Sequence, residues 1–292
     1  GPDGWLYGCH GVFTHSKVGK PGTPDPERLN VTAAVWRYHP TRHVLERFAE
    51  GTSNPWGVDF DEQGQCIIEA CVIPHLWHMI QGAHYQRQGG HHDNPYVYDD
   101  IKTIADHAHY AGNPRPDVTF DKTTGAGVMN NDTNALGGGH AHVGMMIYQG
   151  TNFPKEYRGK VFTTNLHGHR VNVDRLEREG SGYVGKHDPD FMTSDDPWFR
   201  AVEIQYGPDG GVYILDWSDI GECHEADGVH RTSGRIFKVS YGEPKQPGVD
   251  FAKAAPAELV ETFGSDGYRY HFLVDQRFGP DGDFSFEQMV TR

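Results

Sequence analysis

Short runs of β-branched and aromatic residues recur along the chain, and each follows a turn that contains glycine. Four pairs of such runs lie at residues 1–8 with 34–38, 61–68 with 75–80, 157–162 with 170–176, and 207–215 with 234–239. Each pair has the pattern of a β-hairpin with an Asp-Gly-type turn before its first strand. Further runs at residues 56–60, 143–148 and 201–206 add a strand to three of the pairs. Such repeated units are typical of β-propeller blades, and a β-sandwich is the alternative.

The strand pattern is interrupted between residues 81 and 139. A loop of this length usually has a function or a structure of its own. Within it, four apolar residues follow helical spacing after an aspartate pair that can cap a helix. They are Ile101, Ile104, Ala105 and Ala108, preceded by Asp99 and Asp100. The sequence therefore predicts a β domain over residues 1–242, with an insertion at about 81–139 that contains a short helix.

The pattern changes again after Tyr241. Residues 256–263 can form a helix that begins at Pro256, because proline is favoured in the first helical turn. We therefore expect residues 243–292 to be a C-terminal extension that contains the start of a helical region. At the other end, residues 1–4 read as the inside of a turn, and no signal peptide is visible, so we expect the natural chain to begin further upstream.

The composition fits a turn-rich β protein with a buried core. The 292 residues are 36% hydrophobic and 23% charged, and they include 37 glycines, which adopt the positive φ of tight turns at little cost. The net charge is −14, and no cluster of Lys and Arg occurs in the sequence, which argues against a nucleic-acid partner. No apolar run is long enough to form a transmembrane segment.

The four cysteines, Cys9, Cys66, Cys71 and Cys223, form no CxxC pair. If Cys66 and Cys71 share one strand, their odd spacing places them on opposite faces of a sheet. We therefore expect buried thiols rather than a disulfide between these two residues.

Nineteen histidines are present, and many of them come in close pairs. The pairs are His91 with His92, His107 with His109, His140 with His142, His167 with His169, and His224 with His230. In a strand, alternate residues point to the same side, so two imidazoles of an HxH pair can hold a metal ion or a cofactor. The alternative is a set of polar rim residues that are hydrogen-bonded to the backbone. No GxSxG, HExxH, GxGxxG or phosphate-loop motif occurs, and no carboxylate pair is singled out for glycoside hydrolysis.

The stretch from residue 140 to 241 resembles the closing blades of the quinoprotein glucose/sorbosone dehydrogenases. The matching motifs lie at residues 142–148, 153–162, 173–176, 199–200, 207–216 and 234–239. Residues 1–16 and 50–57 are similar to one branch of that family, the planctomycete-type, haem-linked "membrane-bound dehydrogenase" proteins. The resemblance implies a propeller of the six-bladed type, of which this chain would form a partial ring of about four to five blades.

The resemblance also implies a cofactor site. In that family, pyrroloquinoline quinone lies across the central mouth with Ca²⁺, and a histidine base takes the proton of the substrate hydroxyl. Carried over by position, Asn54, His167 and Arg200 would bind the cofactor, and His140, His142 and His169 would bind a metal ion or the substrate. The base histidine would lie upstream of Gly1, so no catalytic residue is assigned. Family cations are replaced by Ser53, His167 and Val202, which leaves fewer partners for the quinone carboxylates.

Three functional hypotheses follow. The first is an exported oxidoreductase domain, periplasmic or extracellular, that oxidises a small sugar or alcohol and passes electrons to a c-type haem on a separate cytochrome domain. The second is a non-catalytic propeller that binds carbohydrate or protein. The third is a metal site formed by the clustered histidines.

Overall fold

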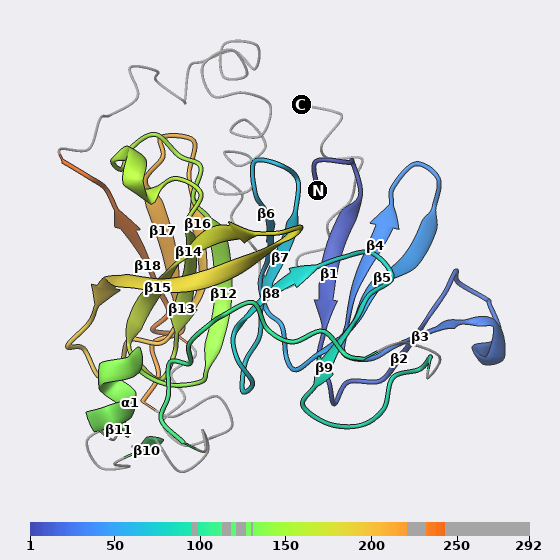
Figure 1. The fold of residues 1–292 in the computed structure, drawn as a ribbon, viewed down its shortest axis with the longest axis horizontal. Coiled ribbons are helices and arrows are strands. Elements are labelled where there is room, and N and C mark those ends of the chain that lie inside the picture. Colours follow the sequence, from blue (N-terminus) through green and yellow to red (C-terminus); the bar gives the residue numbers. More distant parts are fainter. Residues whose placement is uncertain (95–98, 113–117, 121–126, 130, 221–231, 243–292) are drawn as a thin grey trace.

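The computed structural model describes residues 1–94, 99–112, 118–120, 127–129, 131–220 and 232–242 (Figure 1). This part of the chain is almost entirely β-structure, and its main sheets follow one another in sequence order. The expected helix at Pro256 and the extension 243–292 lie outside the described residues.

The first two sheets are formed by the N-terminal third of the chain. The first has the order β1 (Leu6–His10), β4 (Ala34–His39), β5 (Val44–Thr52) and β9 (His84–Arg87), and β9 joins β5 in parallel. A ribbon of β2 (Ser16–Val18) and β3 (Leu29–Val31), with the 3₁₀ turn η1 (Asp25–Glu27), lies between β1 and β4 in the chain. The second sheet is a meander of β6 (Val58–Phe60), β7 (Cys66–Glu69) and β8 (Leu76–Met79).

The third and fourth sheets are formed by the second half of the chain. The third is a meander of β12 (His142–Ile147), β13 (Val161–Asn165), β14 (Arg170–Glu179) and β15 (Gly182–Thr193), with the 3₁₀ turn η2 (Lys155–Tyr157) before β13. The fourth consists of β16 (Ala201–Tyr206), β17 (Val212–Asp216) and β18 (Arg235–Val239). Between the second and third sheets the chain forms β10 (Val118–Phe120), β11 (Gly127–Met129) and the helix α1 (Asn131–Leu136).

The first strands of successive sheets lie next to one another. Strand β1 contacts β6, β6 contacts β12, and β12 contacts β16, so the sheets fan out from a common inner edge (Figure 1). Glycine allows this close approach. A Cβ at Gly57 would lie 2.4 Å from Cγ of Met145, and a Cβ at Gly144, where φ is +64°, would lie 2.7 Å from Cα of Glu203. The fold is that of a β-propeller, as the repeated hairpins predict, and not a sandwich of two stacked sheets.

Apolar clusters fill the spaces between neighbouring sheets. One cluster, which includes Phe162 and Phe199, joins the third and fourth sheets. A second, which includes Trp77 and Tyr85, joins the first and second sheets. The second and third sheets share a smaller apolar cluster with Leu76 at its centre, and polar side chains occupy much of the rest of this space.

The helix predicted within residues 101–108 is wrong, because this segment is extended. The N–H of Ile101 donates to the carbonyl of His84 (2.9 Å), and the N–H of Ile104 donates to the carbonyl of Leu76 (3.0 Å). The carbonyl of Ile104 in turn accepts from the N–H of Gly185 (2.8 Å). The segment therefore bridges the second and third sheets, and its backbone hydrogen bonds come from distant strands rather than from a helical turn. The insertion also contains β9, which the sequence did not predict.

The described cysteines are thiols, as expected. Cys9, Cys66 and Cys71 form no disulfide, and Cys223 lies outside the described residues. Burial raises the pKa of the Cys66 thiol to about 12, so this group is neutral and unreactive at physiological pH.

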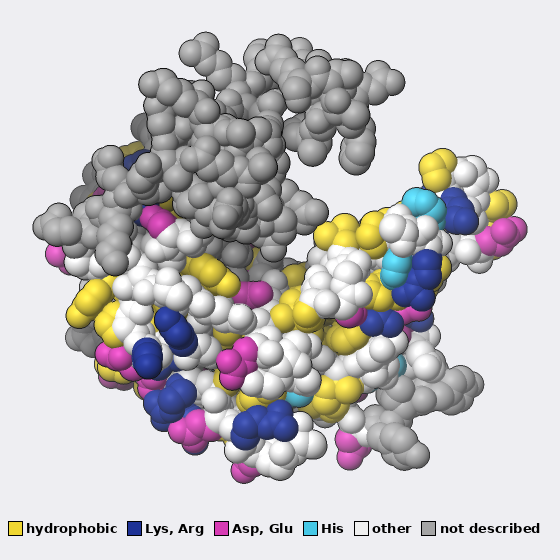
Figure 2. Space-filling view, turned by 90° about the horizontal axis from the view of Figure 1, so that it is seen from above, with side chains coloured by type: hydrophobic (Ala, Val, Ile, Leu, Met, Phe, Trp, Pro, Cys, Tyr) yellow, Lys and Arg dark blue, Asp and Glu magenta, His cyan; other side chains and the backbone are white. Residues whose placement is uncertain are grey.

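Charged side chains of both signs are interspersed on the surface that Figure 2 shows. The ion pairs of the described residues include Arg37 with Glu46 (2.7 Å) and Lys160 with Asp188 (2.7 Å). Within the described ranges, no helix has both the length and the apolar character that crossing a bilayer requires.

Candidate functional site

In the described part of the chain, five histidines and one aspartate gather between the second and third sheets. They are His75, His107, His109, His142, His187 and Asp174. Neighbouring imidazole rings have centroid distances between 4.3 and 5.1 Å. His75 precedes β8, the insertion supplies His107 and His109, and strands of the third sheet supply the rest. We call this set the histidine centre.

The third sheet turns a polar face towards the second sheet. Asp174 on β14 lies directly opposite His187 on β15, so both side chains project from the same face. Since side chains alternate along a strand, Val171 and Val173 project from the other face, where they belong to the apolar cluster shared with the fourth sheet. The alternation of β14 thus places a carboxylate in the space that His75 enters from the second sheet.

Four members of the histidine centre have the spacing of metal ligands. One ligand atom from each of His75, His107, His109 and Asp174 lies within 4.8 Å of all the others. Nε2 of His107 lies 3.2 Å from Nε2 of His109 and 3.1 Å from Oδ1 of Asp174, and Nε2 of His75 lies 2.9 Å from Oδ2 of Asp174. In a tetrahedral site with metal–ligand bonds of about 2.0–2.1 Å, ligand atoms are about 3.3 Å apart. The group therefore fits a single ion.

The remaining ring nitrogens of the two insertion histidines face partners that fix their orientation. Nδ1 of His107 lies 3.1 Å from Oδ1 of Asp106, and Nδ1 of His109 lies 2.8 Å from Nε2 of His142. The N–H of Gly139 donates to the carbonyl of His109 (2.8 Å) and holds its backbone. Metal-binding histidines are commonly oriented in this way by a carboxylate or another polar group on the second nitrogen.

The protonation states of His109, His142 and Asp174 suit a cation, whereas Asp174 and Asp106 outweigh burial and raise the pKa of His107, so this imidazole must release its proton to bind a metal ion. Burial, reinforced by the neighbouring histidines, holds the pKa of His109 and His142 well below the ordinary value, so both are neutral donors. Burial alone would raise the pKa of Asp174, but interactions with His75 and His107 outweigh it and keep the carboxyl ionised. Both Asp174 and His75 are 0% exposed. Oδ1 of Asp174 lies 3.1 Å from Nε2 of His107, so both carboxylate oxygens face imidazole nitrogens.

The residues expected to surround a cofactor form a second neighbourhood along the inner edges of the sheets. The carbonyl of Asn54 accepts from the N–H of Cys71 (3.1 Å), and the N–H of the next residue, Val72, donates to the carbonyl of His140 (3.0 Å). The rings of His140 and His167 meet edge to face at 4.7 Å. The structure thus brings Asn54, His140 and His167 into one row, whereas it places His142 in the histidine centre.

Arg200 and His169 form a pair of their own. Nη1 of Arg200 lies 2.5 Å from Nε2 of His169 and donates to the carbonyls of Pro197 and Phe199 (both 2.9 Å), while Nη2 donates to Ile220 (3.1 Å). Burial lowers the pKa of Arg200 to about 10. Burial and the charge of Arg200 lower the pKa of His169 to about 4, so this imidazole is neutral. The guanidinium is 1% exposed and serves contacts within its own chain.

These residues do not fit the quinone that the resemblance implies. The quinone carboxylates need cationic partners. Of the four positions where the related family has a cation, this chain has one cation, Arg200. The other three positions hold Ser53, His167 and Val202. Arg200 is buried and already bonded to three carbonyl oxygens. Calcium prefers an all-oxygen shell, whereas the histidine centre offers three imidazole nitrogens and one carboxylate. The donor set therefore suits a transition metal and not Ca²⁺.

Sequence reasoning found part of the histidine centre. His107 and His109 form an HxH pair in the sequence, and His142 is a ligand candidate there. Nothing in the sequence points to His75, His187 or Asp174, because isolated histidines and an aspartate in a strand carry no local motif. The single available signal was the high number of histidines, which predicts a cluster without naming its members.

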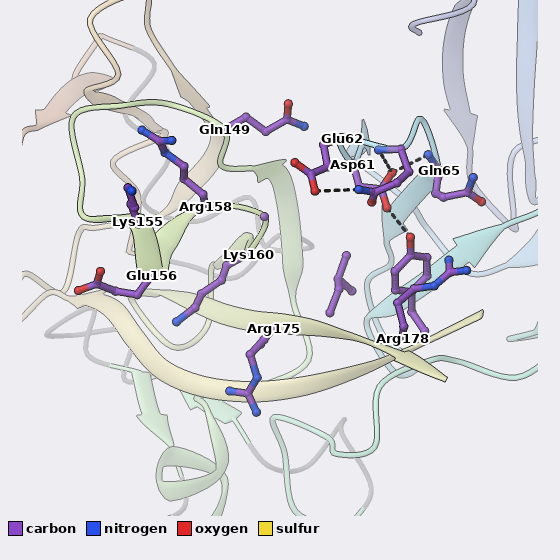
Figure 3. Close-up of a pocket in the computed structure, with 14 residues that line it drawn as sticks. Asp61, Glu62, Gln65, Gln149, Lys155, Glu156, Arg158, Lys160, Arg175 and Arg178 are labelled. Atoms are coloured by element: carbon purple, nitrogen blue, oxygen red, sulfur yellow. Dashed lines mark hydrogen bonds between the residues drawn. The ribbon is translucent and has the colours of Figure 1, made fainter. Parts of the chain in front are cut away.

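A separate pocket of about 900 Å³ opens between the turn before β7 and the β14–β15 hairpin (Figure 3). Acidic and basic side chains share its wall, among them Asp61, Glu156, Lys155 and Arg158, and Tyr183 donates to Oδ2 of Asp61 (2.6 Å). None of the residues predicted for the cofactor lines it.

Comparison with known proteins places the chain in a family. Residues 1–241 match the model described as "Domain of unknown function (DUF7133)". The chain belongs to this family. No curated protein matches it.

Two solved structures with a similar fold are aldose sugar dehydrogenases. The PQQ-bound aldose sugar dehydrogenase of Streptomyces coelicolor shares 14% identity with a TM-score of 0.47, over 82% of this chain and 59% of that chain. The soluble, apo-form aldose sugar dehydrogenase of Escherichia coli shares 16% identity with a TM-score of 0.47, over 81% and 61%. This chain therefore spans about 60% of the length of these structures. The narrower similarity to planctomycete-type membrane-bound dehydrogenases stays a prediction.

Proposed function

We propose that this domain binds a transition-metal ion at the histidine centre and that its chemistry takes place there. The observation that carries the proposal is the convergence of His75, His107, His109 and Asp174, from three separate segments, within 4.8 Å. Imidazole nitrogen with one carboxylate is a donor set that suits zinc, copper, iron or nickel. Three of the four residues, His75, His109 and Asp174, are fully buried, which is unusual for polar side chains.

The centre has one side from which a substrate can approach. The side chains of His107 and His187 are 18% and 27% exposed, whereas that of Asp174 is not exposed. With four protein ligands in place, a substrate oxygen would bind as a fifth ligand, an expansion that catalytic metal sites can undergo, and a metal-bound oxygen becomes more acidic. His107 would hold the ion at its accessible edge, and His187 would line the approach for a hydroxyl group.

The resemblance supports the finer part of the proposal. The substrate would be a small sugar or alcohol, whose hydroxyl carbon loses two electrons and two protons as a carbonyl forms. The electrons would pass to a c-type haem on a separate cytochrome domain, and the protein would be exported to the periplasm or the exterior. Because the quinone does not fit, no step of this oxidation is assigned to it.

A second candidate function is non-catalytic binding of carbohydrate. The pocket of about 900 Å³ favours it, because Tyr183 and hydrogen-bonding side chains of both charges line a cavity away from the histidine centre. Aromatic and polar groups together recognise the apolar and hydroxylated faces of a sugar.

The test is dye reduction by the protein with and without metal. Protein stripped by a chelator is reloaded with copper or iron, or with redox-inactive zinc as a control, and assayed with a panel of sugars and alcohols. We expect turnover to be restored by copper or iron, and no turnover without metal or with zinc. Turnover that requires pyrroloquinoline quinone and Ca²⁺ instead would contradict the proposal, and glycan binding without any turnover would favour the second candidate.

A further inference from the structure

Another group of potential ligands lies on the first sheet, where the insertion begins. Glu50, His84 and His92 each offer one ligand atom, and these atoms lie within 4.8 Å of one another. Glu50 on β5 and His84 on β9 are register partners in the parallel pair, so their side chains are neighbours. His92 comes from the segment after β9 and approaches both. The group shares no residue with the histidine centre.

The two histidines of this group have buried nitrogens that lack partners. Nδ1 of His84 and Nδ1 of His92 are both buried and form no hydrogen bond within the described part of the chain. The two rings have a centroid distance of 4.6 Å, and Nε2 of His84 lies 3.9 Å from Oε1 of Glu50. Nitrogens buried in this way cost free energy unless an ion or a water molecule satisfies them.

One of the histidines is also oriented by a carboxylate. Nε2 of His92 lies 3.0 Å from Oδ1 of Asp100, which leaves Nδ1 as the nitrogen available to a ligand. A carboxylate on the far nitrogen of a metal-binding histidine fixes the ring and increases its basicity. Asp100 would therefore orient the ring of His92 for a site formed by Glu50, His84 and His92.

The charged groups around this site are negative on balance, which favours a cation. Nη1 of Arg47 lies 3.2 Å from Oε1 of Glu50 and 2.8 Å from Oδ2 of Asp93. The charge of Arg47 is therefore shared between two carboxylates. Nε of Arg87 donates to the carbonyl of Gly89 (3.0 Å) rather than to an acid. The three carboxylates, Glu50, Asp93 and Asp100, thus outnumber the two guanidinium groups.

We propose that Glu50, His84 and His92 form a separate site for a divalent transition-metal ion such as Zn²⁺. Three protein ligands and a water molecule complete a tetrahedral shell. The ion fastens the start of the insertion to the first sheet, while His107 and His109 fasten its later part between the second and third sheets. This site does not depend on the function proposed for the histidine centre.

The test compares His92→Ala with His91→Ala, a neighbouring exposed histidine that serves as the matched control. Each protein is dialysed against buffered Zn²⁺, and bound zinc is measured by mass spectrometry. We expect two equivalents for the wild type and for His91→Ala, and one for His92→Ala. A further variant, Glu50→Gln, keeps the size of the side chain and should also bind one equivalent. Backbone amides of residues 88–94 should exchange hydrogen faster in His92→Ala, and faster in the wild type after zinc removal.

Two equivalents in both His92→Ala and Glu50→Gln would overturn the proposal. So would a wild type whose single equivalent is lost in His109→Ala and kept in His92→Ala. Conversely, a single equivalent that is lost in His92→Ala and kept in His109→Ala would refute the histidine centre and support this site. The two proposals can therefore fail separately.

Discussion

Zn²⁺ binding at the histidine centre should weaken on the order of a hundred-fold or more when Asp174 is replaced by asparagine. Removing a group that only orients a metal ligand lowers metal affinity by about 10–100-fold. Asp174 is a ligand itself, so its loss should lower the affinity by at least the upper value. Asp174→Asn keeps the shape of the side chain but removes the single carboxylate of the four ligands. Competition with a chromophoric chelator, in protein that also carries His92→Ala, measures the affinity of this centre alone.

Asp188→Asn is the matched control for this variant. Asp188 lies on the neighbouring strand β15, where its side chain is 10% exposed and pairs with Lys160 and Arg175, away from the centre. Its replacement should leave Zn²⁺ affinity unchanged within about two-fold, because Asp188 contacts none of the four ligands. Equal affinities of the two variants would show that Asp174 is not a ligand. Thermal unfolding in the presence of chelator confirms that both variants fold.

The second large effect concerns the packing of the third sheet on the fourth. Phe162→Ala should lower the free energy of unfolding by about 3–5 kcal/mol, because it removes a buried aromatic side chain and leaves a cavity. Phe162 is 1% exposed, and its ring lies 5.0 Å from that of Phe191 and 5.9 Å from that of Tyr148. Urea denaturation followed by tryptophan fluorescence measures the change.

Phe13→Ala provides the control, because it makes the same chemical change at a residue that is 68% exposed. We expect its effect to stay within about 0.5 kcal/mol. A loss below about 1 kcal/mol for Phe162→Ala would mean that the two sheets do not depend on this aromatic cluster, and the arrangement of neighbouring blades would then need another explanation.

The sheets could be predicted from the sequence because their signals are local. The turn at residues 207–210 has its N–H of Gly210 bonded to the carbonyl of Gly207 (2.8 Å), and the alternating run after it becomes β17. The same combination of turn and strand gave β7 and β13. In each of these units the turn residues and the strand residues favour the same conformation, so few alternatives remain.

The histidine centre could not be predicted in full because its contacts are not local. His75 and Asp174 are 99 residues apart, and nothing near either residue indicates the other. The segment 101–108 shows the same problem. Its apolar spacing fits a helix, but hydrogen bonds to Leu76 and Gly185, on other sheets, hold it extended.

Likewise, the position of Arg200 indicated a cofactor ligand, while its carbonyl contacts show a buried structural residue.

X-ray absorption at the zinc K-edge tests the histidine centre most directly. The sample is the His92→Ala protein loaded with one equivalent of Zn²⁺, so that a single site is observed. We predict a four-coordinate shell at about 2.0–2.1 Å, with the outer scattering of three imidazole rings and the remaining ligand a carboxylate oxygen. A shell of water oxygens without imidazole scattering would contradict the account.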